Sequence, residues 1–227
     1  MEPATFRQWV PRPPSARRGP PPPWAALPPS GRAGRVGDAI AAFRSGPVRD
    51  TGVLDEVGAA VLVPVVAPGT RGATVVLIRR SVDLVRDPGH VAFPGGRLET
   101  GEPPLEAALR EAEEEIGLRR EAVEERGLVD VVRRRRGERI AAFLGLLASR
   151  PELVVNSGEV ESVLEVPIEV LLADGVAWEE RWSDGVEERS VHFFADHGTL
   201  GEDLVWGVTA RILWSLFARC AREGDPA

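Results

Sequence analysis

The sequence predicts an α/β fold in which a mixed β-sheet packs between helices. Short runs rich in β-branched residues recur along the chain and are separated by turns that contain glycine and proline, which is the pattern of strands. Two other segments repeat apolar residues at the helical period of about 3.6 residues, which is the pattern of amphipathic helices. Strands and helices mixed in this way favour layers of sheet and helix around one core.

The first strands should form a hairpin. Residues 58–66 and 72–80 are apolar, β-branched runs, and the Pro-Gly pair at 68–69 favours a turn between them. A third, short strand is expected at residues 89–93, where the turn-forming segment 94–96 stops it.

Helices and further strands are expected after this turn. A helix should cover residues 103–116, because proline suits the first helical turn and Gly117 suits the C-terminal cap. An apolar stripe predicts a second helix at residues 206–222. The other expected elements are short helices at 36–43 and 167–173, strands at 128–132, 139–148 and 160–166, and a hairpin of strands at 177–182 and 188–194.

The chain is expected to divide into a folded domain and two tails. Residues 1–35 hold many prolines and arginines, and we predict a disordered tail there because such a segment cannot form a helix or a sheet ladder. The folded domain should span residues 36–222, and a short C-terminal tail should follow at 223–227.

Composition argues against several classes of protein. With 43% hydrophobic and 28% charged residues, the chain is typical of a globular protein. The net charge of -7 argues against a nucleic-acid binder, which more often carries a basic field. No apolar run approaches the roughly 20 residues needed to span a bilayer, and the N-terminus lacks the apolar core of a secretory signal. Because Cys220 is the single cysteine and cannot form an internal disulfide, we expect a cytoplasmic protein without a membrane partner.

The helix expected at residues 103–116 carries a cluster of glutamates. On a helical wheel Glu111, Glu114 and Glu115 lie together on the side away from the apolar stripe. That stripe consists of Leu105, Ala108, Leu109, Ala112 and Ile116. Neighbouring carboxylates repel one another, and a hard divalent cation such as Mg²⁺ or Mn²⁺ would compensate them. A run of glutamates on a helix is more often only a solvated face, so the run alone leaves both interpretations open.

The wider pattern around these glutamates resembles the signature of the Nudix hydrolases. Along the chain it reads Gly96, five residues, Glu102, seven residues, Arg110-Glu111, Glu114-Glu115 and Gly117-Leu118. Many positions of this motif are fixed, and only Ala112 departs, where a larger aliphatic residue is more usual. The resemblance implies a Nudix α/β/α sandwich with a mixed β-sheet between helices, and metal-dependent hydrolysis of a diphosphate linkage.

The resemblance also implies roles for the matching residues. Glu111 and Glu115 correspond to the principal metal ligands, and Glu114 would assist them. The carbonyl group of Gly95 would be a further ligand. The structural positions of the motif are Gly96, Glu102, Arg110 and Gly117. Of these, Arg110 and Glu102 would brace the loop against the helix.

Residues 79–99 resemble the coenzyme A diphosphatase branch of this family, through Arg80-Ser81 and the segment 89–96. Residues 158–171 and 205–213 are similar to the same branch. The chain departs from the branch at four positions. Ile78 stands where threonine is usual, Val85 where arginine is usual, Asp87 where histidine is common and His90 where glutamine is common.

Several residues outside the motif are candidates for the site. Arg79, Arg80 and Arg86 could bind a phosphate group of the substrate, and surface ion pairs are the alternative. Glu159 matches a glutamate that follows the motif in the branch, and it could bind a second metal or act as general base; a solvated loop residue is the equal alternative. For His90, ligand contact and a purely structural role are both open.

The leading hypothesis is hydrolysis of coenzyme A or acyl-coenzyme A to 3′,5′-ADP and 4′-phosphopantetheine or its acyl form, with Mg²⁺ or Mn²⁺. One alternative is a Nudix hydrolase of ADP-ribose, dinucleotides or nucleoside triphosphates. A second is a ligand-sensing Nudix domain without catalysis, against which the complete set Glu111, Glu114 and Glu115 argues. The expected partner is a small-molecule nucleotide, no nucleic acid is expected, and a homodimer is left open.

Overall fold

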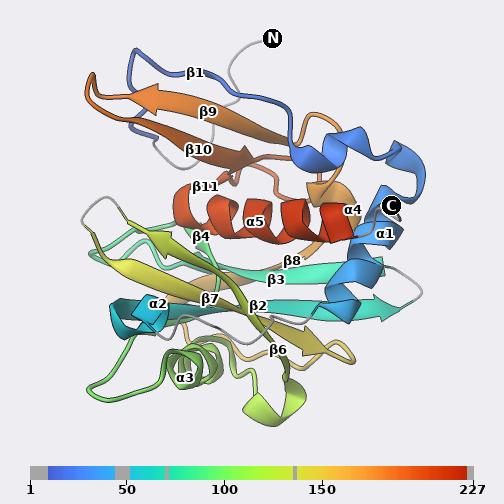
Figure 1. Cartoon of the computed structure of the whole chain (residues 1–227). Helices are drawn as coiled ribbons and strands as arrows, with labels where there is room; N and C mark the ends of the chain where they lie inside the picture. Colours follow the sequence, from blue (N-terminus) through green and yellow to red (C-terminus); the bar gives the residue numbers. More distant parts are fainter. Residues whose placement is uncertain (1–9, 44–51, 70–71, 135–136, 224–227) are drawn as a thin grey trace.

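The computed structural model describes residues 10–43, 52–69, 72–134 and 137–223. Within these ranges the largest unit is a seven-stranded mixed sheet with the path β4-β3-β2-β7-β6, where β5 also pairs with β2 and β8 with β3 (Figure 1). The sheet is mixed because β2 and β7 run parallel while β2 and β3 run antiparallel. Its strands are β2 Val57–Gly69, β3 Gly72–Arg80, β4 Val91–Ala92, β5 Gly95–Arg97, β6 Glu124–Arg133, β7 Arg139–Leu147 and β8 Val160–Pro167.

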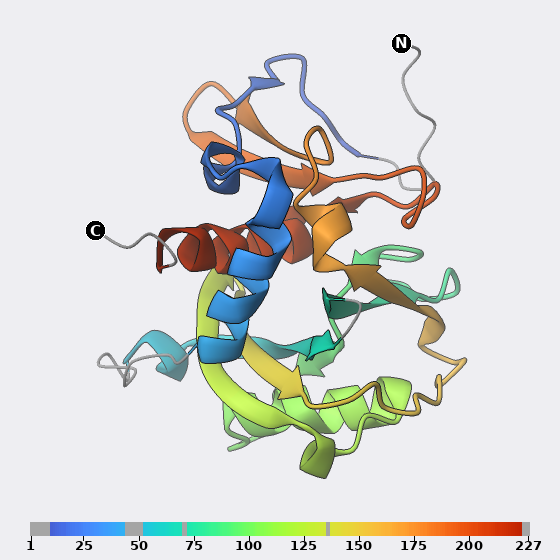
Figure 2. The ribbon, with the colours of Figure 1, turned by 90° about the vertical axis from the view of Figure 1, so that its right-hand side faces the viewer.

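Helices cover both faces of this sheet. α3 (Pro104–Ile116) lies on one face, and α1 (Pro29–Ala42) and α5 (Gly207–Glu223) lie on the other (Figures 1 and 2). Successive side chains of a strand point to opposite faces. In β3, Val75 and Leu77 therefore pack in the core that contains α5, whereas Val76 and Ile78 pack against α3. The predicted α/β/α sandwich with a mixed sheet is confirmed.

Most expected elements are present with shifted ends. α3 ends where predicted, because Gly117 has the left-handed φ of 66° that a C-terminal cap requires. The strand expected at 89–93 contracts to β4, and α1 begins at Pro29 rather than at residue 36. The short helices are α2 Gly52–Asp55, α4 Ile168–Leu171, η1 Pro23–Ala26 and η2 Arg120–Ala122. In the described ranges no helix is long and apolar enough to cross a membrane.

A second, four-stranded sheet lies beyond α5, with the order β1-β9-β10-β11 (Figure 1). Its strands are β1 Arg17–Arg18, β9 Ala177–Ser183, β10 Glu188–Phe194 and β11 Val205–Trp206. The hairpin of β9 and β10 was predicted, but its place outside the main sheet was not. α5 is buried between the two sheets, and this accounts for its wide apolar face.

The disordered tail predicted for residues 1–35 is wrong for residues 10–35. Trp24 is only 1% exposed, and its ring packs against Trp214 at 4.9 Å, Phe217 at 5.6 Å and Phe194 at 6.1 Å between centroids. Arg32 is also buried and donates hydrogen bonds to the carbonyl groups of Leu27 and Leu172. The segment also contributes β1, which pairs with β9, and the first turns of α1, so its prolines do not exclude regular structure, and one buried indole ring anchors it. The domain therefore begins before residue 36, and residues 1–9 lie outside the described ranges.

The C-terminal boundary also differs from the prediction. α5 extends to Glu223, which was expected to begin the tail. Residues 224–227 lie outside the described part of the chain.

Candidate metal centre

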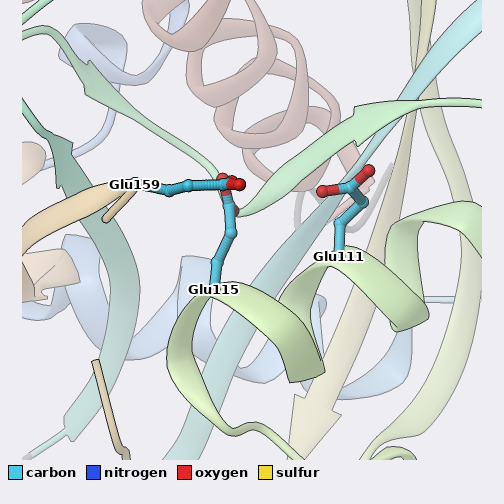
Figure 3. Close-up of side chains that lie close together, drawn as sticks. All are labelled: Glu111, Glu115 and Glu159. Carbon is cyan, nitrogen blue, oxygen red and sulfur yellow. The ribbon is translucent and has the colours of Figure 1, made fainter. Parts of the chain in front are cut away.

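Three carboxylates meet at the end of α3. Oxygen atoms of Glu111, Glu115 and Glu159 all lie within 4.8 Å of one another. Glu111 and Glu115 stand one turn apart on α3, and Glu159 reaches the same place from the turn that precedes β8 (Figure 3). Three anions this close are unfavourable without a compensating charge, and oxygen ligands are those that a hard divalent cation prefers.

Glu115 is the most deeply buried member of this cluster, with an exposed fraction of 1%. The backbone N–H of Gly95 donates to its Oε2 at 3.0 Å, and Nη1 of Arg80 lies 3.7 Å from its Oε1. Burial raises the pKa of Glu115 to about 7, although the Gly95 hydrogen bond and Arg80 act in the opposite direction. Because the helical wheel placed Glu115 away from the core, its burial is a correction: the loop at Gly95 folds over this side of the helix.

Glu111 lies beside it, half-buried, against the second glycine of the loop. A Cβ atom added to Gly96 would come within 2.2 Å of the Glu111 carboxylate, and one added to Gly95 would meet the Ala60 carbonyl oxygen at 2.4 Å. Both positions therefore require glycine, and Gly95 also has a φ of 153° that other residues rarely adopt. Burial is again the largest cause that raises the pKa of Glu111 above its usual value.

Arg110 ties the loop to the helix, as the resemblance implied. Its Nε and Nη2 donate to both oxygens of Glu102, at 2.9 and 3.1 Å. Nη2 also donates to the carbonyl group of Arg97 at 3.1 Å, and Nη1 to Glu111 at 3.0 Å. The hydrogen bond from Arg110 is the main reason that the pKa of Glu102 is lowered. A bidentate pair of this kind resists rotation, so it holds the loop in one position relative to Glu111.

Glu114 differs from what the wheel suggested. Its side chain is 58% exposed and accepts a hydrogen bond from Arg110 at 3.1 Å. The cluster of the described residues contains Glu159 in its place. An assisting role for Glu114 in metal binding stays a prediction, as does the Gly95 carbonyl ligand.

A family model described as NUDIX domain matches residues 57–186. The chain belongs to the Nudix family. It is 41% identical over 116 residues to Nudix hydrolase 3 of Caenorhabditis elegans, a match that covers 49% of this chain and 48% of that protein. It is 32% identical over 159 residues to the uncharacterized Nudix hydrolase NudL of Pectobacterium atrosepticum, covering 70% of this chain and 80% of that protein. The chain thus spans about half of one relative and most of the other.

The fold agrees with this membership. A MutT/nudix family protein from Enterococcus faecalis superposes with a TM-score of 0.50 at 18% identity, over 74% of this chain and 63% of that one. Nudix hydrolases act on phosphoanhydride bonds and generally use divalent metal ions, and the carboxylate cluster suits such an ion. We call residues 96–118, from Gly96 to Leu118, the Nudix box.

The three arginines predicted to bind substrate are not equivalent. Arg79 and Arg80 are neighbours on β3, so they point to opposite faces of the sheet. Arg79 pairs with the buried carboxylate of Asp203 and donates a hydrogen bond to Ser162 at 3.0 Å. Its side chain therefore lies on the face of the sheet opposite to α3. Arg80 approaches Glu115, and Arg86 is exposed in the loop that follows β3. The prediction for Arg79 is therefore corrected to a structural ion pair.

The position of Glu159 depends on contacts that the sequence pattern does not contain. The N–H of Asn156 donates to the Glu115 carbonyl group at 2.9 Å, and the N–H of Glu159 donates to the Asn156 carbonyl at 3.1 Å. The N–H of Ser81 in turn donates to the carbonyl group of Glu159 at 2.9 Å. This loop is thereby fixed to both α3 and the end of β3, and its glutamate is brought beside the Nudix box.

Proposed function

We propose that this protein hydrolyses a diphosphate linkage in a nucleoside diphosphate derivative, with a divalent cation held by Glu111 and Glu115 in the cluster that Glu159 completes. The observation that carries the proposal is the convergence of these carboxylates within 4.8 Å. Burial raises the pKa of Glu115 to about 7, which supports the proposal because a bound cation would stabilise the ionised carboxylate. Mg²⁺ or Mn²⁺ would supply the missing charge.

When bound, the cation would neutralise the diphosphate and make a bound water molecule a better nucleophile. Residues of the chain would orient the ligands, fix the loop, accept a proton and bind phosphate. The Gly95 N–H orients Glu115, and Arg110 with Glu102 keeps the loop closed on Glu111. Glu159 is exposed at the edge of the cluster, where it can accept a proton from the attacking water or bind a second cation. Arg80 would bind a phosphate oxygen once a cation compensates the negative charge of Glu115 in its place.

Coenzyme A or acyl-coenzyme A is the substrate that we propose first, with 3′,5′-ADP and 4′-phosphopantetheine or its acyl form as products. The resemblance of residues 79–99 to the coenzyme A diphosphatase branch supports this choice. Arg80 and Arg86 remain as candidate phosphate contacts, since Arg79 pairs with Asp203. ADP-ribose, dinucleotides and nucleoside triphosphates are the alternative substrates. The three converging carboxylates argue against a domain that only senses a ligand.

The test is an assay of coenzyme A, dephospho-coenzyme A, ADP-ribose and a dinucleoside polyphosphate, each with Mg²⁺ or Mn²⁺. Glu115→Gln keeps the size of the side chain and removes its charge, so kcat should fall on the order of a hundredfold or more. The matched control is Glu113→Gln, because Glu113 is an exposed glutamate on the same helix outside the cluster. Full activity in excess chelator, or equal losses in the two variants, would reject the metal centre.

A further inference from the structure

Four aromatic rings form a continuous row across the small sheet. Trp178 of β9 and Trp206 of β11 are both cross-strand partners of Phe193 on β10. The ring of Phe193 is nearly parallel to both, with centroids 5.1 Å from Trp178 and 6.5 Å from Trp206. His90, which precedes β4, continues the row with its centroid 5.6 Å from Trp206. The row therefore begins on the small sheet and ends on the loop that leads into the Nudix box.

The two ends of this aromatic row differ in their hydrogen bonding. At one end, the indole N–H groups of Trp178 and Trp182 donate to Glu180 at 3.1 and 2.8 Å, and Arg12 binds the same carboxylate. At the other end, the indole nitrogen of Trp206 is buried and has no hydrogen-bond partner among the described residues. A buried donor without a partner lowers stability. The hydrogen bonds of Trp178 therefore stabilise the fold, whereas the buried N–H group of Trp206 does not.

His90 lies next to the metal centre. Its carbonyl group accepts a hydrogen bond from the backbone N–H of Arg80 at 3.0 Å, and the guanidinium group of Arg80 lies 3.7 Å from Glu115. The negative charge of Asp87 and the positive charges of Arg134 and Arg80 act on the pKa of His90 in opposite directions. His90 is half-buried, so the residue keeps some contact with solvent. Burial, the largest cause, lowers the pKa of His90, and the ring is therefore uncharged at neutral pH.

We propose that the imidazole ring of His90, which packs against Trp206, stacks on the base of the nucleotide substrate. The proposal rests on the proposed function and adds the residue that recognises the nucleoside half. The base would be the next ring of the aromatic row, and an uncharged imidazole suits contact with its π-face. Arg80 contacts both His90, through its backbone N–H, and Glu115, through its guanidinium group, so it would bind the diphosphate if base and cation are bound together.

The test compares a ligand that has a base with one that lacks it. ADP and inorganic pyrophosphate are titrated by calorimetry in the presence of Ca²⁺, which takes the same kind of oxygen ligands. Loss of one stacked ring in His90→Ala should raise the Kd of ADP by about tenfold and leave that of pyrophosphate unchanged. His90→Phe keeps an aromatic ring at the position and should restore ADP binding.

Trp178→Leu is the matched control, because it removes a ring at the far end of the row. It should leave both affinities unchanged. Unaltered ADP binding in His90→Ala, equal weakening of both ligands, or the same loss in Trp178→Leu would overturn the proposal. Trp206→Leu provides a second variant with the same expected selectivity, and melting curves establish that each variant is folded. A wild-type protein that binds ADP through His90 but hydrolyses no compound of the panel would reject the proposed function and leave this inference standing.

Discussion

The burial of Trp24 leads to a prediction about the N-terminal segment. Trp24→Ala removes a ring that is 1% exposed and that contacts three other rings of the core. Replacing a buried tryptophan by alanine costs about 3–5 kcal/mol, because apolar contact is lost and a cavity remains. The free energy of unfolding of a whole domain is about 5–15 kcal/mol, so this one substitution should remove a large share of it.

The assay is thermal and urea unfolding of the wild type, Trp24→Ala and Trp24→Phe. For a chain of this length, each kcal/mol shifts Tm by about 2–4 °C, and the alanine variant should melt roughly 10 °C lower. Trp24→Phe keeps part of the ring contact and should lose less, and Ala26→Ser at an exposed position of the same segment is the control. A chain that starts at Arg35 should be destabilised at least as much, because it also lacks the buried Arg32. An unchanged Tm in Trp24→Ala would refute the packing of this segment against α5.

Three further predictions concern the Nudix box and the arginines that precede it in the chain. Glu115 has a pKa of about 7 in the fold against an ordinary 4.5, so the stability that its protonated form contributes is lost as pH rises through 7. In chelator, acidification from about pH 8 to about pH 6 should raise Tm in the wild type and less in Glu115→Gln, and an equal rise in both would contradict this. Arg110→Ala should lower Tm and weaken metal binding together, whereas Glu111→Gln should mainly lower kcat; equal Tm losses would argue against bracing. If coenzyme A is the substrate and Arg86 binds its 3′-phosphate, Arg86→Ala should erase about 1.5–3 kcal/mol of preference in kcat/KM over dephospho-coenzyme A. Arg79→Ala should instead lower Tm and keep that preference, and a preference lost in Arg79→Ala alone would reverse the assignment.

The helical wheel was right about spacing and wrong about environment. It placed Glu111 and Glu115 one turn apart, and both join the carboxylate cluster. It also placed Glu115 on the solvated side, although this residue is buried. The wheel describes one helix only, whereas burial depends on the loop at Gly95, which approaches from another part of the chain. For the same reason it grouped Glu114 with the other two, although Glu114 is exposed and pairs with Arg110.

Local physical chemistry decided what the sequence alone could predict. The strand pairing of residues 58–66 with 72–80, the extent of α3 and its Gly117 cap depend on neighbours a few positions away, and the Nudix box lies within one such stretch. Its fixed spacing also led to the family.

The tertiary structure decided every feature that needs residues far apart in the chain. It turned Arg79 toward Asp203, brought Glu159 to Glu115, and set His90 at the end of a row of rings from another sheet. It also fixed the position of the proline-rich segment, because the ring of Trp24 packs against rings of α5 and β10 that are far away along the chain. Such contacts follow from how layers pack around a shared core, and periodicity along the chain carries no information about which distant side chain fills the facing space.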